Sequence, residues 1–305
     1  MRSGRTEKFA RLFLKIAMSN LSALPSEGSG GSGRNPADSA LQVEFAELSD
    51  PGKQRGHNED CLGHAAPASA AEARSHGWLF VLADGVGGTE RGEVASQAAV
   101  EYVTAGFLAA PGGEPLSALL MRLSQEANAH IYETGRNASP GGTSMSTTLV
   151  ACALRYDRLV VAHAGDSRCY LIRQGQARLM TRDHTVAQDQ ARLGVLSAKE
   201  AAQAPTRHIL SRSLGTELFV NVETSDIQVL PGDVLLLCCD GLYHSIEASE
   251  MAAIAGRGGD LKAAARRLVD LANDRDGSDN ISVQLIRIRS VERVGMYRGR
   301  PYKLR

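Results

Sequence analysis

Apolar and polar positions alternate in two rhythms along the chain from about residue 41 onward. The run "HGWLFVLADG" at residues 76–85 is apolar and ends at a glycine turn, which predicts a buried strand. β-Forming residues also dominate the segments 145–155, 158–173, 220–230, 232–241 and 279–289. Helical periodicity marks the segments 93–110, 115–133, 247–256 and 261–273.

The order of these segments predicts the fold class. Two helices come early, a block of strands follows, and two helices precede the last strand, so strands and helices come in runs. Such runs favour α+β layers over a regular βαβ repeat. The 305 residues suffice for one large domain or two small ones, with ordinary hydrophobic (43%) and charged (22%) fractions. No run of eighteen apolar residues predicts a membrane-spanning helix.

The two ends of the chain differ from its centre. Residues 1–18 have helical spacing of apolar residues opposite a basic face, which predicts an amphipathic helix that contacts an anionic membrane or an acidic partner. The alternative is a poorly ordered extension. Residues 19–40 have the composition of a flexible linker. We therefore expect an extension and linker at 1–40, one domain at 41–290 and a basic tail at 291–305.

Charge is unevenly distributed although the formal net charge is zero. Residues 19–286 contain 22 basic and 32 acidic residues, a net charge of −10. An acidic centre does not favour nucleic-acid binding, but it permits a carboxylate-rich site that needs cations. The five cysteines match no zinc or disulfide spacing, and we expect reduced thiols in a cytosolic protein.

Isolated acidic residues stand at the ends of the predicted strands. Each one alone indicates only a turn, but several in one domain with no nearby lysine suggest that a cation neutralises them. Oxygen ligands select hard cations such as magnesium or manganese. The residues in question are Glu59 and Asp60 after Arg55, Asp84 before Gly85, Asp166 in "HAGDSR", Asp240 before Gly241, and Asp279 with Asn280.

Eight segments in order give this pattern a family resemblance. They read "SDPGKQRGHNEDCLG", "LADGVGGTERGEVAS", "MSTTLVACAL", "AHAGDSRCYLI", "TRDHT", "RHILSRSLG", "GDVLLLCCDGL" and "GSDNISVQLI". Over residues 42–288 the chain resembles the metal-dependent protein phosphatases of the PPM family, also called type 2C, and most of all the compact bacterial members. The resemblance implies a four-layer α-β-β-α sandwich in which helices flank two central, mostly antiparallel sheets.

The resemblance also implies roles for individual residues. Two Mn²⁺ or Mg²⁺ ions would bridge a water or hydroxide between the sheets, and a third, weaker ion would bind beside them. Asp84 would bridge both tight ions, and Asp240 and Asp279 would complete the ligands of one. The other would take the Gly85 carbonyl and a carboxylate of Glu59 or Asp60, and the third ion would share Asp240 with Asp166. Arg55 would hold the substrate phosphate, and Asn280 would orient Asp279.

The implied activity is hydrolysis of phosphoserine and phosphothreonine on proteins by the bridging water, in opposition to a bacterial Ser/Thr kinase. We expect a cytoplasmic protein, peripherally membrane-associated if residues 1–18 bind lipid, with monomer as the default state. A phosphatase fold that acts as an inactive regulatory module is one alternative, and a two-metal phosphodiesterase or nuclease is another.

One departure from the family concerns the proton donor. Many relatives have a histidine shortly after the aspartate–glycine turn, whereas Gly85 is followed here by Val86, Gly87, Gly88 and Thr89. His57 could substitute, although a solvated loop histidine is the plainer interpretation, and a metal-bound water is the other candidate.

Histidines and serines elsewhere receive structural interpretations. We expect His163 to be a satisfied core histidine. His184 and Arg212 frame the alanine-rich stretch 185–208, which the resemblance identifies as a mobile, substrate-selecting flap. Ser211 and Ser213 have no acidic or histidine neighbour arranged for nucleophilic attack.

Overall fold

The computed structural model describes residues 40–86, 91–138, 144–297 and 300–303. The amphipathic helix expected in residues 1–18 lies outside this part of the chain, and so does the linker up to residue 39. No helix among the described residues is long and apolar enough to cross a membrane.

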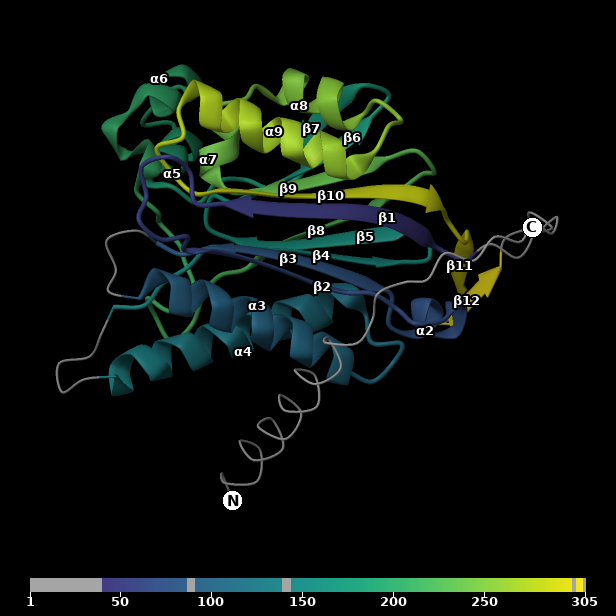
Figure 1. Ribbon diagram of the computed structural model, residues 1–305. Coiled ribbons are helices and arrows are strands. Elements are labelled where there is room, and N and C mark those ends of the chain that lie inside the picture. The colour runs from purple at the N-terminus through teal and green to yellow at the C-terminus, as the bar shows by residue number, and fades with distance from the viewer. Residues whose placement is uncertain (1–39, 87–90, 139–143, 298–299, 304–305) are drawn as a thin grey trace. The chain divides into compact units, whose positions relative to one another are not determined.

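Two five-stranded antiparallel sheets lie at the centre of the described domain (Figure 1). The first sheet has the order β1 (Gln42–Asp50), β10 (Ile281–Ser290), β9 (Val234–Cys238), β6 (Arg168–Arg173) and β7 (Gln176–Leu179). The second has the order β2 (Asp60–Ala65), β3 (Trp78–Asp84), β4 (Leu149–Arg155), β5 (Arg158–Ala164) and β8 (Glu223–Gln228). Part of the predicted basic tail pairs as β11 (Val294–Tyr297) and β12 (Arg300–Lys303).

Helices cover the outer face of each sheet (Figure 1). Helices α3 (Gly92–Ala109) and α4 (Leu116–Asn137) pack on the second sheet, and α8 (Ala248–Ala255) and α9 (Leu261–Arg275) pack on the first. The remaining helices are the short α2 (Ala70–Ser75), α5 (Val186–Arg192), α6 (Ala198–Gln203), the 3₁₀ helix η2 (Pro205–His208) and α7 (Asp240–Tyr243). The predicted α-β-β-α sandwich is confirmed.

Strand periodicity decides which residues enter the space between the sheets. In β3, Leu79, Val81 and Ala83 belong to the core under α3 and α4, whereas Phe80 and Leu82 belong to the core between the sheets. Because successive strand residues point to opposite faces, the next residue in the second series, Asp84, also faces the other sheet. Burial of a Leu or Phe stabilises the fold by about 1.5–3 kcal/mol, so the apolar positions fix this register.

Candidate active site

A cavity of about 580 Å³ brings most of the predicted residues together. It is formed where β3 ends, β10 begins and α7 begins. Its lining includes Arg55, Glu59, Asp84, Gly85, Asp166, Asp240 and Asp279, together with His208, Ile209 and Leu210 of the segment before β8. Five segments far apart in the sequence therefore supply acidic groups to one end of the inter-sheet space.

Asp60 and Asp84 face each other across two neighbouring strands. They are direct partners in the register of β2 and β3. Both carboxylate oxygens of Asp60 are buried, and neither accepts a hydrogen bond from any described residue. Burial raises the pKa of both groups, and at Asp84 the charge of Asp60 raises it further. Like charges directly opposite in a sheet repel each other and destabilise it. A cation bound between Asp60 and Asp84 would remove this repulsion.

Two threonines hold the backbone of Asp84 in place. The Asp84 amide donates to Thr148 Oγ1 at 3.0 Å, and Thr147 Oγ1 donates to the Asp84 carbonyl at 2.8 Å. Thr148 Oγ1 also shares a 2.7 Å hydrogen bond with Ser167 Oγ, next to Asp166. Both threonines lie in the family segment "MSTTLVACAL", but the resemblance implied no role for their hydroxyls. The sequence feature that could have indicated this role is the pair of adjacent threonines directly before a buried strand.

Asp240 approaches Asp279 because Gly241 lacks a side chain. A Cβ on Gly241 would lie 2.1 Å from the Asn280 carbonyl oxygen, so any other residue would push α7 away from the start of β10. Burial raises the pKa of Asp240, and the charges of Asp166 and Asp279 raise it further. The close packing therefore concentrates negative charge at this point.

Asn280 ties the loop before β2 to the start of β10. Its Nδ2 donates to the carbonyls of Pro51 and His57, each at 3.0 Å, and its Oδ1 accepts from the Glu59 amide at 2.8 Å. Its contact with Asp279 runs through its own backbone amide, which donates to Asp279 Oδ1 at 2.9 Å. The side chain thus positions the loop of Glu59, while the backbone contacts Asp279.

Among the described residues, Arg55 is the one arginine that forms an ion pair with these carboxylates. Its Nη2 donates to Asp279 Oδ2 at 2.8 Å, and that hydrogen bond raises the arginine pKa. The Arg55 side chain is 42% exposed and lines the cavity. Glu59 lies nearby, with its carboxyl packed against Gly92 at the start of α3, and burial raises its pKa.

Asp166 is only 7% exposed, and burial raises its pKa to about 6. Arg168 stands two residues further along the chain, but its guanidinium forms no ion pair with Asp166. The Arg168 guanidinium instead donates to both oxygens of Asp183, at 2.9 and 2.6 Å, and stacks 3.5 Å above the Tyr243 ring. Asp166 therefore faces the cavity without an ion pair to that arginine, whose nearby charge lowers the Asp166 pKa by less than burial raises it.

Two buried histidines, one in β5 and one in the segment before α5, support the turn that carries Asp166. His163 is 5% exposed and hydrogen-bonds through Nε2 to the backbone of Arg182, which confirms its interpretation as a core histidine. Its ring stacks on His184 with centroids 4.7 Å apart. His184 Nδ1 accepts from the Gly165 amide at 3.2 Å, and its backbone amide donates to the Gly165 carbonyl at 3.0 Å. Burial lowers the His184 pKa to about 4, so this ring is a neutral brace at neutral pH.

The segment expected to form a flap is built from α5, α6 and η2. Thr185 and Ser197 cap α5 and α6 with side-chain hydrogen bonds to Gln188 and Glu200. Val186 and Ile209 are joined by a 2.8 Å backbone hydrogen bond that closes the base of the segment. Its last residue, His208, lines the cavity, whereas His57 does not, although the His57 carbonyl accepts from Asn280.

The donor set fits hard divalent cations. Carboxylates from five segments converge, their pKa values are raised where they are buried, and the Asp60 oxygens have no described donor. Gly85 adds a backbone position that no side chain could share, since a Cβ there would lie 2.5 Å from Gly92 and 2.7 Å from the Glu59 carbonyl oxygen. All-oxygen sites of this kind suit Mg²⁺ and Mn²⁺.

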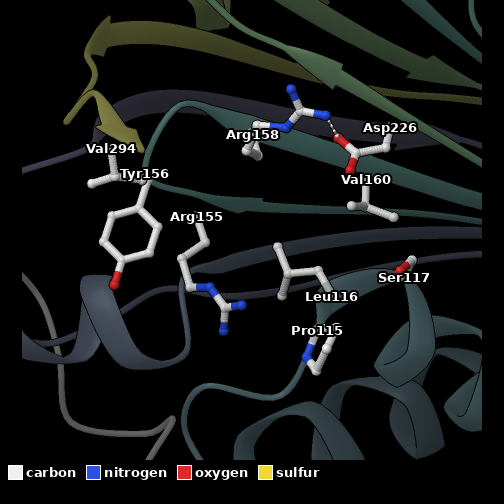
Figure 2. Close-up of a pocket in the computed structure, with 9 residues that line it drawn as sticks. All are labelled: Pro115, Leu116, Ser117, Arg155, Tyr156, Arg158, Val160, Asp226 and Val294. Atoms are coloured by element: carbon white, nitrogen blue, oxygen red, sulfur yellow. Dashed lines mark ion pairs between the residues drawn. The ribbon is translucent and has the colours of Figure 1, made fainter. Parts of the chain in front are cut away.

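A second cavity, of about 410 Å³, has a different chemistry (Figure 2). It lies between the start of α4, the β4–β5 turn and Val294. Arg158 pairs there with Asp226 at 2.6 Å, and Arg155 donates to the carbonyls of Ser75 and Glu114. Asp226 is the one acidic side chain among the described residues that line it. Both arginines are already engaged, so this cavity does not compete with the acidic one as the active site.

Fold and site together define a metal-dependent hydrolase, and comparisons with known proteins identify its family. The protein phosphatase 2C family matches residues 60–284. The serine/threonine phosphatase stp of Listeria innocua is 34% identical over 265 residues, covering 85% of this chain and 99% of that protein.

Solved structures agree with the sequence match. The serine/threonine phosphatase of S. agalactiae superposes with a TM-score of 0.73 at 30% identity, covering 81% of this chain and all of that one. The catalytic domain of the phosphatase PstP, solved with two manganese ions, gives a TM-score of 0.68 at 30% identity over 82% of this chain and all of that one. The chain belongs to the protein phosphatase 2C family.

It is a metal-dependent serine/threonine protein phosphatase of the bacterial type, as the resemblance implied, and its substrates are phosphorylated proteins. Nothing in the comparisons or the described site supports the inactive regulatory module. All the acidic residues that the resemblance implies are present in the sequence. Five of them line one cavity, and the sixth, Asp60, lies opposite Asp84 in the strand register.

Proposed function

We propose that this phosphatase holds two divalent cations, Mn²⁺ or Mg²⁺, between Asp84, Asp240, Asp279, the Gly85 carbonyl and the Glu59–Asp60 pair. A third, weaker cation would lie between Asp166 and Asp240. The observation that carries the proposal is the pair Asp60 and Asp84, whose buried carboxylates oppose each other with raised pKa values. Divalent cations, when bound there, supply a water of lowered pKa and neutralise phosphoryl charge.

The protein's own residues orient this chemistry. Thr147 and Thr148 hold the backbone of Asp84 through hydrogen bonds to its amide and carbonyl. The Asp84 carboxylate therefore starts from a fixed backbone position. Asn280 fixes the loop that carries Glu59. Rigid placement matters because transition-state stabilisation requires groups that do not reorganise during the reaction.

Arg55 is proposed to bind the substrate phosphate. Its guanidinium pairs with Asp279 at 2.8 Å, and the side chain is 42% exposed at the cavity. When Asp279 binds a cation, its charge is shared, and the planar fork of Arg55 can turn to two phosphoryl oxygens. A phosphomonoester dianion would then be held at the acidic cavity by one cationic side chain and the bound ions.

The physiological setting is also proposed. The opposing enzyme would be a bacterial Ser/Thr kinase, whose products would be the substrates. The protein would act as a monomer in the cytoplasm, with residues 1–18 contacting an anionic membrane or an acidic partner.

A substrate comparison tests the proposed function. Purified protein in manganese should hydrolyse a phosphothreonine peptide and an aryl phosphomonoester, and should leave a bis-aryl phosphodiester almost untouched. Excess chelator should abolish both activities, and added Mn²⁺ or Mg²⁺ should restore them. Full turnover in chelator, or faster cleavage of the diester, would contradict the proposal.

A further inference from the structure

Two histidines and one of the proposed ligand acids meet at the mouth of the cavity. His208 ends η2, and Asp240 and His244 are one helical turn apart at the two ends of α7. One ligand atom from each of the three lies within 4.8 Å of the others. His244 Nδ1 is 3.7 Å from Asp240 Oδ2, and the two imidazole rings meet edge to face with centroids 4.9 Å apart.

The imidazole nitrogens of this group are available. Within the described part of the chain, neither the His208 ring nor the His244 ring makes a hydrogen bond, and the His244 side chain is 38% exposed. Arg168 and Arg207 are both close enough to act on His244, and Arg168 is already bound to both oxygens of Asp183. The rings can therefore rotate toward a ligand from solvent without breaking a contact that holds the fold.

We propose that His208, Asp240 and His244 form a zinc site that joins the flap segment to α7. Two imidazoles and one carboxylate, with a water in the fourth position, are a common zinc donor set. Zn–N and Zn–O bonds of about 2.0–2.2 Å place tetrahedral ligand atoms about 3.3–3.6 Å apart. The 3.7 Å separation of His244 and Asp240 needs only a small side-chain rotation to reach this value.

The donor type separates this site from the acidic site beside it. Nitrogen ligands raise the affinity for zinc well above that for manganese, and magnesium avoids imidazole. Magnesium should therefore fill the oxygen ligands of Asp84 and Asp279 without occupying the two histidines. Zinc in this site would draw on Asp240, which is proposed to serve the catalytic cations, and would hold η2 against α7 at the mouth.

A second cluster of two histidines and one acid differs because its side chains already have protein partners. His163, His184 and Glu223 also lie within 4.8 Å of one another. There, however, Glu223 already binds Arg182 and Arg212, and both rings are hydrogen-bonded to described backbone groups. A metal would have to displace those partners, so the cluster is a structural brace.

Zinc counting tests the proposal directly. Wild type, His208→Gln, His244→Gln and the control His130→Gln are dialysed to equilibrium against buffered zinc with magnesium in large excess. His130 is an exposed histidine on α4 that stacks on Tyr102 and lies outside the three-residue group. Wild type and His130→Gln should bind one zinc more than either of the other variants. In His208→Gln and His244→Gln the affinity for this zinc should be at least about 100-fold lower than in wild type, since losing even a residue that only hydrogen-bonds to a metal ligand lowers metal affinity about 10–100-fold.

Hydrogen exchange supplies a second readout that does not depend on turnover. Zinc should slow amide exchange in 198–208 of wild type and of His130→Gln, and should leave it unchanged in His208→Gln and His244→Gln. Equal zinc content in all four proteins, or loss of the zinc in only one of the two histidine variants, would overturn the three-ligand site. Both measurements are independent of phosphatase activity, so their outcome is separate from that of the proposed function.

Discussion

Replacing Asp166 by asparagine should stabilise the metal-free protein at alkaline pH. Asp166 is 7% exposed, and burial with the nearby charge of Asp183 raises its pKa from 3.8 to about 6. A folded-state pKa above the unfolded value means that the folded protein binds the proton more tightly. The stability contributed by this group is thus complete below pH 3.8 and is lost as the pH rises through about 6.

The expected size follows from the shift. A rise of roughly two pKa units corresponds to about 3 kcal/mol of unfolding free energy lost above pH 7. Asparagine has nearly the same shape and no charge, so Asp166→Asn should recover this amount at pH 8 and almost none at pH 4. For a domain of this size the gain corresponds to roughly 6 °C or more in the midpoint of thermal unfolding.

The assay is urea and thermal unfolding in excess chelator across this pH range. Asp183→Asn serves as a contrasting control, because it removes the charge and one of the two acceptor oxygens that Arg168 contacts and should destabilise the protein by about 1.5–3 kcal/mol. Manganese should narrow the gap between wild type and Asp166→Asn. Equal stability of these two proteins at pH 8 without metal would refute the view that burying the Asp166 charge has a net cost.

Three further predictions concern other parts of the chain. Arg55→Ala should raise the Michaelis constant for an aryl phosphate with little change in manganese affinity, and a normal Michaelis constant would remove Arg55 from the phosphate site. Asn280→Ala should reduce turnover at saturating substrate by about tenfold or more, because Glu59 loses its anchor; unchanged turnover would show that the loop holds itself. Deletion of 1–40 should leave aryl phosphate hydrolysis intact while weakening binding to anionic vesicles, and lost hydrolysis would show that the segment supports the domain.

Long periodic segments made most of the fold predictable. The strand ending at Asp84 and the helices at 93–110 and 261–273 lie within two residues of β3, α3 and α9. Helix α4 runs four residues past its predicted end, to Asn137, where no strong stop signal is present. Strands β1 and β2 were not predicted, because their register is set by pairing with β10 and β3, which no local pattern reveals.

The acidic residues of the site were predictable for a similar reason. An aspartate at the end of an apolar strand and followed by glycine is a pattern of a few consecutive residues, so it can be recognised from the sequence alone. The roles of Thr147, Thr148 and Asn280's side chain were not visible, because they depend on contacts across more than 60 residues of chain. His208 was likewise seen only as the end of the flap, since its approach to His244 is purely tertiary. The roles of the acidic residues as metal ligands, and of the threonines and Asn280 as positioning groups, stay predictions.

Manganese binding to wild type and Asp84→Asn tests the central claim most directly. Calorimetric titration of the metal-free proteins should show two tight sites in wild type, and loss of at least one in Asp84→Asn, with turnover falling by at least about two orders of magnitude. Asp226→Asn, an exposed aspartate of β8 at the other cavity, should match wild type. Two unchanged manganese sites and near-normal turnover in Asp84→Asn would contradict the account.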